Sequence, residues 1–505
     1  YSAVQLQQGR VMLDSDWNEQ SEIIQYQDQV ERKDVVGPSG VPKDENGFEI
    51  TLSSGGNDLI IAPGKIYAEG LLCELEPGKT PVSYFNQPHY PNPDDTYFLS
   101  SPPDSPPESP PSSPPDSPPS EGITAAIQNG TYLVYLDAWQ QEINHIDDPR
   151  IKEVALGQAD TTTRLKVVWQ VKMLPVETEP DEEVSCDMDL DEWQDYISPP
   201  SGKLNARTVE KGSKTEPCSL PPSAGYQRLE NQLFRIEIQK GGDRNEATFK
   251  WSRDNASVQT KITEVDGKVL TVADLGKDEI LGFAAGQWVE IIDEEVALNN
   301  KTRSLFQIDS VTPETSEITL NDSAAAFQGK KKLKLVRWDQ NGTTGDADGI
   351  AMASGWQEIE GGIEVQFSNG NYRDGDYWLI PARTATGEIE WPPFEVPNIN
   401  PEEQPPRGVQ HHFAKLAILQ VEGGMAHLID CRRKFPPLTN LKAEDIGYDS
   451  GYCEIGDATT VQDAIDMLCD VQDLRDHNKH VHGTGVVCGL KVICAPDRAN
   501  VLVEK

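Results

Sequence analysis

The sequence lacks long hydrophobic runs, an excess of basic residues and a secretion signal. No run of about 18 apolar residues occurs, so we expect no membrane-spanning helix and no direct membrane insertion. The 44 Lys and Arg face 83 Asp and Glu, a net charge of -39. Binding to phosphates needs clustered cations, so we expect no nucleic-acid partner. Because Tyr1–Val4 is not a basic segment before an apolar core, we predict synthesis in the cytoplasm without a signal peptide.

Cysteines are few and scattered. No C-x-x-C pair occurs, and the spacing gives little evidence for disulfides or for zinc. We therefore expect buried free thiols in a chain made in a reducing compartment. The eight cysteines are Cys73, Cys186, Cys218, Cys431, Cys453, Cys469, Cys488 and Cys494.

Motifs of known chemistry are also missing. Gly78-Lys79-Thr80 resembles the end of a phosphate-binding loop, but Cys73 occupies the position of its first glycine. Neither a G-x-S-x-G elbow nor an H-E-x-x-H helix occurs. We therefore predict that the chain is not an enzyme, has no catalytic residues and needs no cofactor.

One histidine cluster is a weak candidate for a metal site. Imidazole and thiolate groups would suit zinc, but the spacing matches no zinc motif. Histidines at a helix end also often bond to its last carbonyl groups. We therefore predict no metal and keep as weak candidates His477, His480, His482 and Cys488.

What the sequence does contain is a strong β pattern. Runs such as TYLVYLDAW (Thr131–Trp139) and RLKVVWQVKML (Arg164–Leu174) are rich in branched and aromatic residues, as central strands are. Short strands with turn residues between them are typical of sandwiches and barrels. We predict a mainly β fold of tandem β-sandwich or barrel-like domains, with an N-terminal helix and a C-terminal helical segment.

Changes in pattern divide the chain into consecutive units. Half of the residues in SPPDSPPESPPSSPPDSPPS (Ser101–Ser120) are proline, which favours an extended spacer. The predicted units are a strand-helix segment (1–45), a small β domain (46–100), a Pro-rich linker or insertion (101–122), a β domain with an acidic loop (123–230), two further β domains (231–345 and 346–436) and a C-terminal helix plus strand segment (437–505).

Two predicted helices carry apolar stripes that need a partner surface. The first runs from about Asp16 to Lys33, after a strand-like start in which Val4, Leu6, Val11 and Leu13 alternate with polar residues. The second opens at Thr460 with a pattern like a capping box. We predict that the stripes bind a partner through Ile23, Tyr26 and Val30 on the first helix and Val461, Ile465 and Leu468 on the second.

Several charged residues stand next to predicted strands. We expect them to hold turns or contacts between domains by hydrogen bonds, because no nucleophile lies beside a base in the sequence. They are Arg253, Asp254, Arg373, Asp374, Asp376 and Arg383.

Four strings together resemble one bacterial family. They are VQLQQGRVMLDSDWNEQ (Val4–Gln20), the segments within Tyr132–Val171, NQLFRIEIQKGG…ATFKWSRDNASV (Asn231–Val258) and IEVQFSNGNYRDGDYWLIPARTATGEIEWP (Ile363–Pro392). The chain is similar to tail-associated proteins encoded near contractile injection systems, which are phage-tail-like particles. The resemblance implies partners among the other subunits of such a particle, assembly in a symmetric ring, and incorporation into an intracellular or released particle.

Two functions follow as hypotheses. The first is a structural component of the injection particle: a baseplate-associated shell, cage or extension subunit. The second is a carbohydrate-binding or carbohydrate-active surface protein, which would use exposed tryptophans near carboxylates. Trp356, Trp378 and Trp391 are the tryptophans that would line such a sugar platform, and packing within sheets is the alternative that we favour.

Overall fold

The computed structural model has a mainly β fold with a helix near each end, which confirms the predicted fold class. It describes residues 1–76, 80–98, 123–124, 127–177, 185–209, 225–299, 304–340, 347–394, 400–448, 458–469, 485–487, 490–494 and 501–504. The Pro-rich segment 101–122 lies outside the described residues.

The first β unit packs sheets around one core, in which Phe48 and Trp169 meet edge to face at 5.0 Å between ring centres. One five-stranded sheet has the order β7-β27-β26-β8-β9, and a smaller one has the order β28-β1-β4-β5. The strands are β1 (Ser39–Pro42), β2 (Ile50–Leu52), β3 (Leu59–Ile61), β4 (Gly64–Ala68), β5 (Leu71–Leu75), β6 (Val82–Ser83), β7 (Ile123–Thr124), β8 (Gly130–Ile143), β9 (Arg164–Val176), β26 (His411–Glu422), β27 (Met425–Asp430) and β28 (Lys434–Phe435).

The second β unit has a five-stranded sheet in the order β20-β13-β11-β24-β25 and a three-stranded sheet in the order β10-β22-β21, which share a core. A two-stranded ribbon, β12-β23, lies beside them. The strands are β10 (Leu204–Thr208), β11 (Gln232–Lys240), β12 (Gly242–Asp243), β13 (Thr248–Ser252), β20 (Ile350–Ala351), β21 (Gln357–Glu360), β22 (Ile363–Phe367), β23 (Asn371–Tyr372), β24 (Tyr377–Arg383) and β25 (Glu388–Ile389).

The third β unit is a closed barrel with the strand order β14-β15-β18-β17-β16-β19 and a core of its own. Its strands are β14 (Gln259–Asp266), β15 (Val269–Val272), β16 (Trp288–Ile292), β17 (Leu305–Thr312), β18 (Glu317–Leu320) and β19 (Lys334–Trp338). The short helix α3 (Glu294–Asn299) follows β16 and places Leu298 against Trp139 and Val168 of the first unit.

The units are nested, which differs from the predicted consecutive division. The barrel is inserted into the second unit between β13 and β20, and the second unit is inserted into the first between β9 and β26. Strand β26 returns to pair with β8, with Leu419 opposite Tyr132. Sequence patterns locate strands but do not show which strands pair. The predicted units 46–100, 123–230 and 346–436 all contribute residues to one core, so they are not three separate domains.

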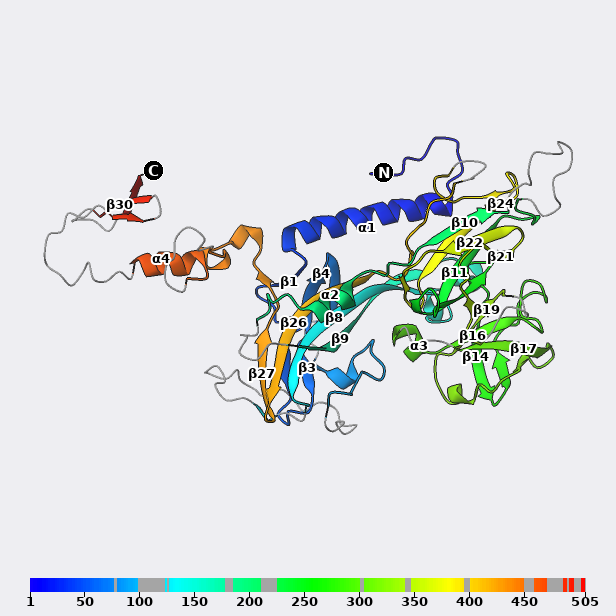
Figure 1. Cartoon of the computed structure of the whole chain (residues 1–505), viewed down its shortest axis with the longest axis horizontal. Coiled ribbons are helices and arrows are strands. Elements are labelled where there is room, and N and C mark those ends of the chain that lie inside the picture. The colour runs from blue at the N-terminus through cyan, green and yellow to red at the C-terminus, as the bar shows by residue number, and fades with distance from the viewer. Residues whose placement is uncertain are drawn as a thin grey trace.

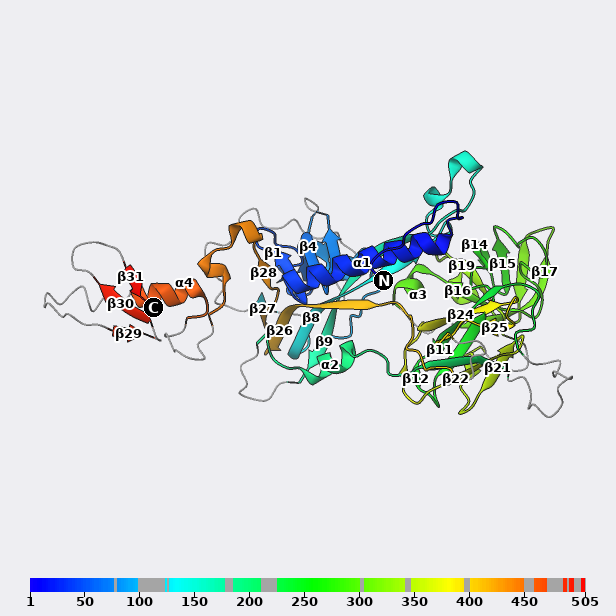
Figure 2. The ribbon, with the colours of Figure 1, turned by 90° about the horizontal axis from the view of Figure 1, so that it is seen from above.

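The predicted N-terminal helix is confirmed as α1 (Asp14–Val36), which lies across the first unit (Figures 1 and 2). The strand expected within residues 4–13 is absent, because that segment pairs with no described strand. The acidic loop also ends in a helix, α2 (Asp191–Ile197), because Trp193 is buried against Tyr135 of β8.

The predicted C-terminal helix is α4 (Val461–Cys469). Its capping box is confirmed: the backbone N–H of Asp463 donates to the hydroxyl of Thr460 at 3.1 Å, and that of Thr460 donates to the Asp463 carboxylate at 2.9 Å. The strands β29 (Gly485–Val487), β30 (Leu490–Cys494) and β31 (Val501–Glu504) form a separate small sheet.

Candidate functional site: an open groove beside helix α1

Helix α1 has no buried residue, although it carries large apolar side chains. Of the predicted stripe, Ile23 is half-buried, whereas Tyr26 is 69% and Val30 is 39% exposed. Trp17 is 68% exposed at the other end of the helix. The helix therefore presents an apolar surface that the described part of the chain does not cover.

A close approach at Gly70 holds the helix near the first unit. Gly70 has a φ of +84°, and a Cβ there would lie 2.2 Å from the carbonyl oxygen of Gln29. Any other residue would therefore strain the backbone and push α1 away. An ion pair of 3.4 Å between Lys33 and Glu69 adds a second, exposed contact.

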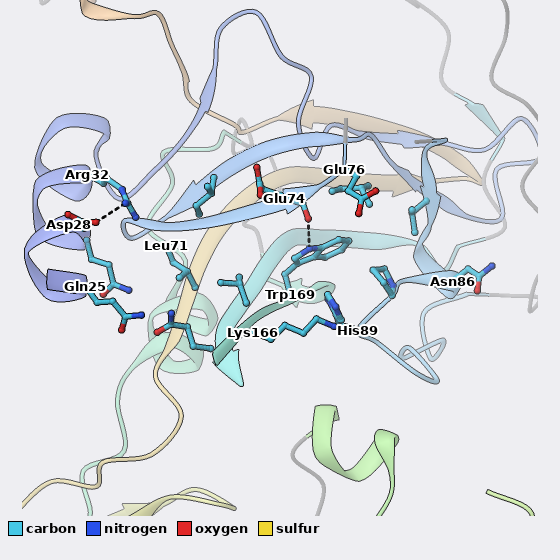
Figure 3. A pocket seen from close by; sticks show the side chains of 17 residues that line it. Gln25, Asp28, Arg32, Leu71, Glu74, Glu76, Asn86, His89, Lys166 and Trp169 are labelled. Atoms are coloured by element: carbon cyan, nitrogen blue, oxygen red, sulfur yellow. Dashed lines mark hydrogen bonds and ion pairs between the residues drawn. The ribbon is translucent and has the colours of Figure 1, made fainter. Parts of the chain in front are cut away.

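Between α1 and the sheets lies an open groove of about 820 Å³ (Figure 3). Its floor is apolar and includes Leu71 and Leu75 of β5 and Trp169 of β9. Its rim is polar, with Arg32 of α1 and Lys166 of β9 among the lining residues. Such a mixture suits an extended peptide segment, because apolar side chains can face the floor while the polar backbone meets the rim.

Two interactions order the groove. The indole N–H of Trp169 donates to the carbonyl oxygen of Glu74 at 3.1 Å, and Arg32 pairs with Asp28 at 3.2 Å (Figure 3).

Burial lowers the pKa of His89 to about 4, with a smaller contribution from the charge of Lys166. The buried Nδ1 of His89 has no hydrogen-bond partner among the described residues.

Strand β9 lies at the edge of its sheet, so one side of its backbone faces away from β8. At Val171 this side is capped by Gln87, whose side-chain amide donates to the Val171 carbonyl at 2.8 Å and accepts from its N–H at 2.7 Å. The β8–β9 pairing runs without a bulge, so the backbone N–H and C=O groups of Leu165, Val167 and Trp169 point to the same side as those of Val171. No described residue caps the backbone of Leu165 or Val167.

A second cleft, of about 410 Å³, lies where the three β units meet. Lys250 is buried behind its lining residues Glu237, at 3.3 Å, and Glu290, at 2.8 Å, and lies over the ring of Trp338. On the side of the first unit, Asp137 pairs with Lys172 at 2.6 Å. Burial alone would raise the pKa of Asp137, but the interactions with Lys172 and His411 outweigh burial and lower it. His411 lies 2.5 Å from the same carboxylate. Lys250 of the second unit pairs with Glu290 of the barrel, whereas Asp137 pairs within the first unit. We interpret this cleft as a junction between the units.

The charged residues beside strands hold turns and contacts between segments, as predicted. Arg253 pairs with Glu360 at 3.1 Å, and Asp254 pairs with Arg337 at 3.1 Å. Arg373 donates to backbone carbonyls at the end of α2, Asp374 accepts from the N–H of Gly241, and Arg383 pairs with Glu390. Asp376 differs: its backbone carbonyl accepts from the N–H of Ile238, whereas its buried Oδ2 has no hydrogen-bond partner among the described residues.

The structure describes only some of the other predicted site residues. The weak metal candidates His477, His480, His482 and Cys488 lie outside the described residues. Within the part of the chain that the structure describes, no three His, Cys, Asp or Glu side chains gather as metal ligands. On α4, Ile465 is exposed and Val461 is half-buried, and Leu468 lies in the helix without a described side chain.

The expectation of free thiols is wrong for one pair. Cys186 and Cys431 form a disulfide that joins the segment before α2 to the end of β27. Their separation of 245 residues hid the pair from an argument based on spacing. Cys73 is free and buried as expected, and burial raises the pKa of its thiol to about 12.

The tryptophans considered for a sugar platform do not form one. Trp378 and Trp391 are buried in the core of the second unit, and their indole N–H groups donate to the carbonyl oxygens of Gln404 and Glu402. Trp356 is half-buried with its ring 4.2 Å from the guanidinium of Arg207. Packing, the favoured alternative, accounts for Trp378 and Trp391, whereas Trp356 is outside the core and contacts Arg207.

No described helix is both long enough and apolar enough to cross a membrane. A model of a family of unknown function, DUF6519, matches residues 1–98, 108–189 and 197–456. Neither a curated protein nor a solved structure matches the chain.

Proposed function

We propose that this chain, which belongs to the DUF6519 family of unknown function, is a structural subunit of a phage-tail-like contractile injection system. In this role it is a baseplate-associated shell, cage or extension subunit that binds neighbouring subunits. The assignment to such a particle comes from the sequence strings described above. The observation that carries the role of an assembly subunit is the apolar surface of α1, which has no partner within the described chain.

The internal architecture supports a role as a rigid building block. Gln170 of β9 donates to the carbonyl oxygen of Leu298 at 3.0 Å, which ties the barrel to the first unit. Asn144 and Gln259 join the same two units at 2.9 Å. Buried polar contacts between units restrict their relative motion, and a subunit that must hold neighbours in register benefits from that restriction.

The alternative of a carbohydrate-binding protein has less support, because the aromatic side chains that would form its platform are packed. No described feature favours it over the assembly role, so we propose only the latter.

The test is copurification from cells that produce the protein. A tagged chain should carry sheath and tube proteins with it, and Tyr26→Asp combined with Val30→Asp should remove them, because two charges would then face the apolar partner surface. Ile280→Asp, at a similarly exposed apolar position between β15 and β16 of the barrel, is the matched control and should retain them. A tagged chain without sheath or tube proteins would contradict the proposed function.

A further inference from the structure

The uncapped part of the β9 edge is a place where another strand can add. Leu165 and Val167 direct their N–H and C=O groups away from β8, toward the side that Gln87 caps at Val171. Val167 also lines the groove beside α1. Exposed strand edges of this kind pair readily with an extended segment, through backbone hydrogen bonds.

The segment 1–13, which we call the N-terminal arm, has the properties of such a strand. Val4 and Leu6 alternate with polar residues before Gly9, and an apolar run, Val11–Leu13, follows it, yet the arm pairs with no described strand. Leu6 is 62% and Val11 is 84% exposed. The arm rests on α1 through few bonds, among them one of 2.8 Å from the N–H of Val4 to the side-chain carbonyl of Gln20.

Both segments lack the acidic residues that make copies of this chain repel one another. Copies with a net charge of -39 repel one another, so self-association needs surfaces without acids. The arm contains no Asp or Glu and has one basic residue, Arg10. Strand β9 also contains no acid and carries Arg164, Lys166 and Lys172.

The arm lies on the outer side of its own α1, whereas the sheets lie on the other side of that helix (Figures 1 and 2). We propose that the arm of one copy adds as a strand to the β9 edge at Leu165 and Val167 of a second copy. This inference rests on the proposed function, since it names the neighbour as another copy of this chain. The contact joins two different surfaces, so repeated contacts produce a ring or a filament.

Complementation between two variants of the purified full chain tests the proposal. Leu6→Asp with Val11→Asp disables the arm and leaves the edge intact. Val167→Pro removes an outward N–H from the edge, where proline is tolerated, and leaves the arm intact. Each variant alone should associate at least about tenfold more weakly than the unaltered chain, because backbone hydrogen bonds and apolar contacts are lost. A mixture should form a one-to-one dimer, because each supplies what the other lacks.

Sedimentation velocity provides the measurement, and unfolding midpoints verify that the variants are folded. Leu165→Pro replaces Val167→Pro if the latter fails to fold, and Ile280→Asp should associate like the unaltered chain. An unaltered chain that stays monomeric, a single variant that associates as tightly as the unaltered chain, or a mixture without dimers would overturn the proposal. Because only purified chain is used, those results leave copurification with sheath and tube proteins as an independent test of the proposed function.

Discussion

Gln87 and Val171 are joined by two hydrogen bonds, of 2.8 Å and 2.7 Å, through which one side-chain amide takes the place of a neighbouring strand. Gln87 is buried, so neither group of Val171 has water as a substitute partner. The Gln87 side chain therefore satisfies the outward backbone groups of β9 at Val171, whereas those at Leu165 and Val167 have no such cap among the described residues.

Replacing Gln87 by methionine should therefore lower the free energy of unfolding by about 2–4 kcal/mol, since two buried backbone groups lose their partner. Urea denaturation measures the change. Asn86→Met alters the exposed neighbouring residue and should leave the midpoint nearly unchanged. A Gln87→Met variant as stable as the original would show that the cap does not stabilise the edge.

Lys250→Met should cost about 3–5 kcal/mol, because it removes the buried cation that Glu237 and Glu290 share, although Glu237 keeps its ion pair with Arg235 at 2.7 Å. Adding Glu290→Gln should recover part of that loss by lowering the negative charge that Lys250 no longer balances. Denaturant unfolding of the unaltered chain and the two variants gives the comparison. Equal stability of Lys250→Met with and without Glu290→Gln would contradict the role of Lys250 in balancing the charge of Glu290.

Opening the disulfide should destabilise the first unit by about 2–4 kcal/mol, because the unfolded chain gains freedom when the link between Cys186 and Cys431 is lost. A thiol reductant should lower the melting temperature of the unaltered chain but not that of Cys186→Ser combined with Cys431→Ser. Cys73→Ala is the control and should keep the response to reductant. Alkylation of both Cys186 and Cys431 in the folded, unreduced chain would contradict the bond.

His89 should make the stability depend on pH. Its folded pKa of about 4 lies below the ordinary value of 6.5, so the unfolded chain binds a proton that the folded chain does not. Stability should be fully present above pH 6.5 and should fall as the pH drops toward 4. With a discount for partial exposure, the loss is about 1–2 kcal/mol. His89→Phe keeps a ring beside Trp169 and should flatten the dependence in this interval, whereas an unchanged slope would contradict the role of His89.

Sequence patterns predicted the local elements because burial periodicity and capping residues are local properties. The α4 capping box at Thr460 and the strands around Thr131–Trp139 are examples. The nesting of units was beyond such patterns, since β8 and β26 are distant in sequence and meet only through the fold. The spacing of apolar residues predicted the stripe of α1. The groove could not be predicted in this way, because it depends on Gly70, Gln87 and Trp169, which come together from separate strands and loops. The N-terminal arm was predicted as a strand, and it pairs with no strand in the described part of its own chain.

Imaging of native particles tests the central claim most directly. Particles purified from cells with and without the gene for this chain should differ by a defined density at or around the baseplate, and the unaltered gene should restore it. The variant carrying Tyr26→Asp and Val30→Asp should not restore it. Particles of identical structure with and without the chain would contradict its proposed role as a structural subunit.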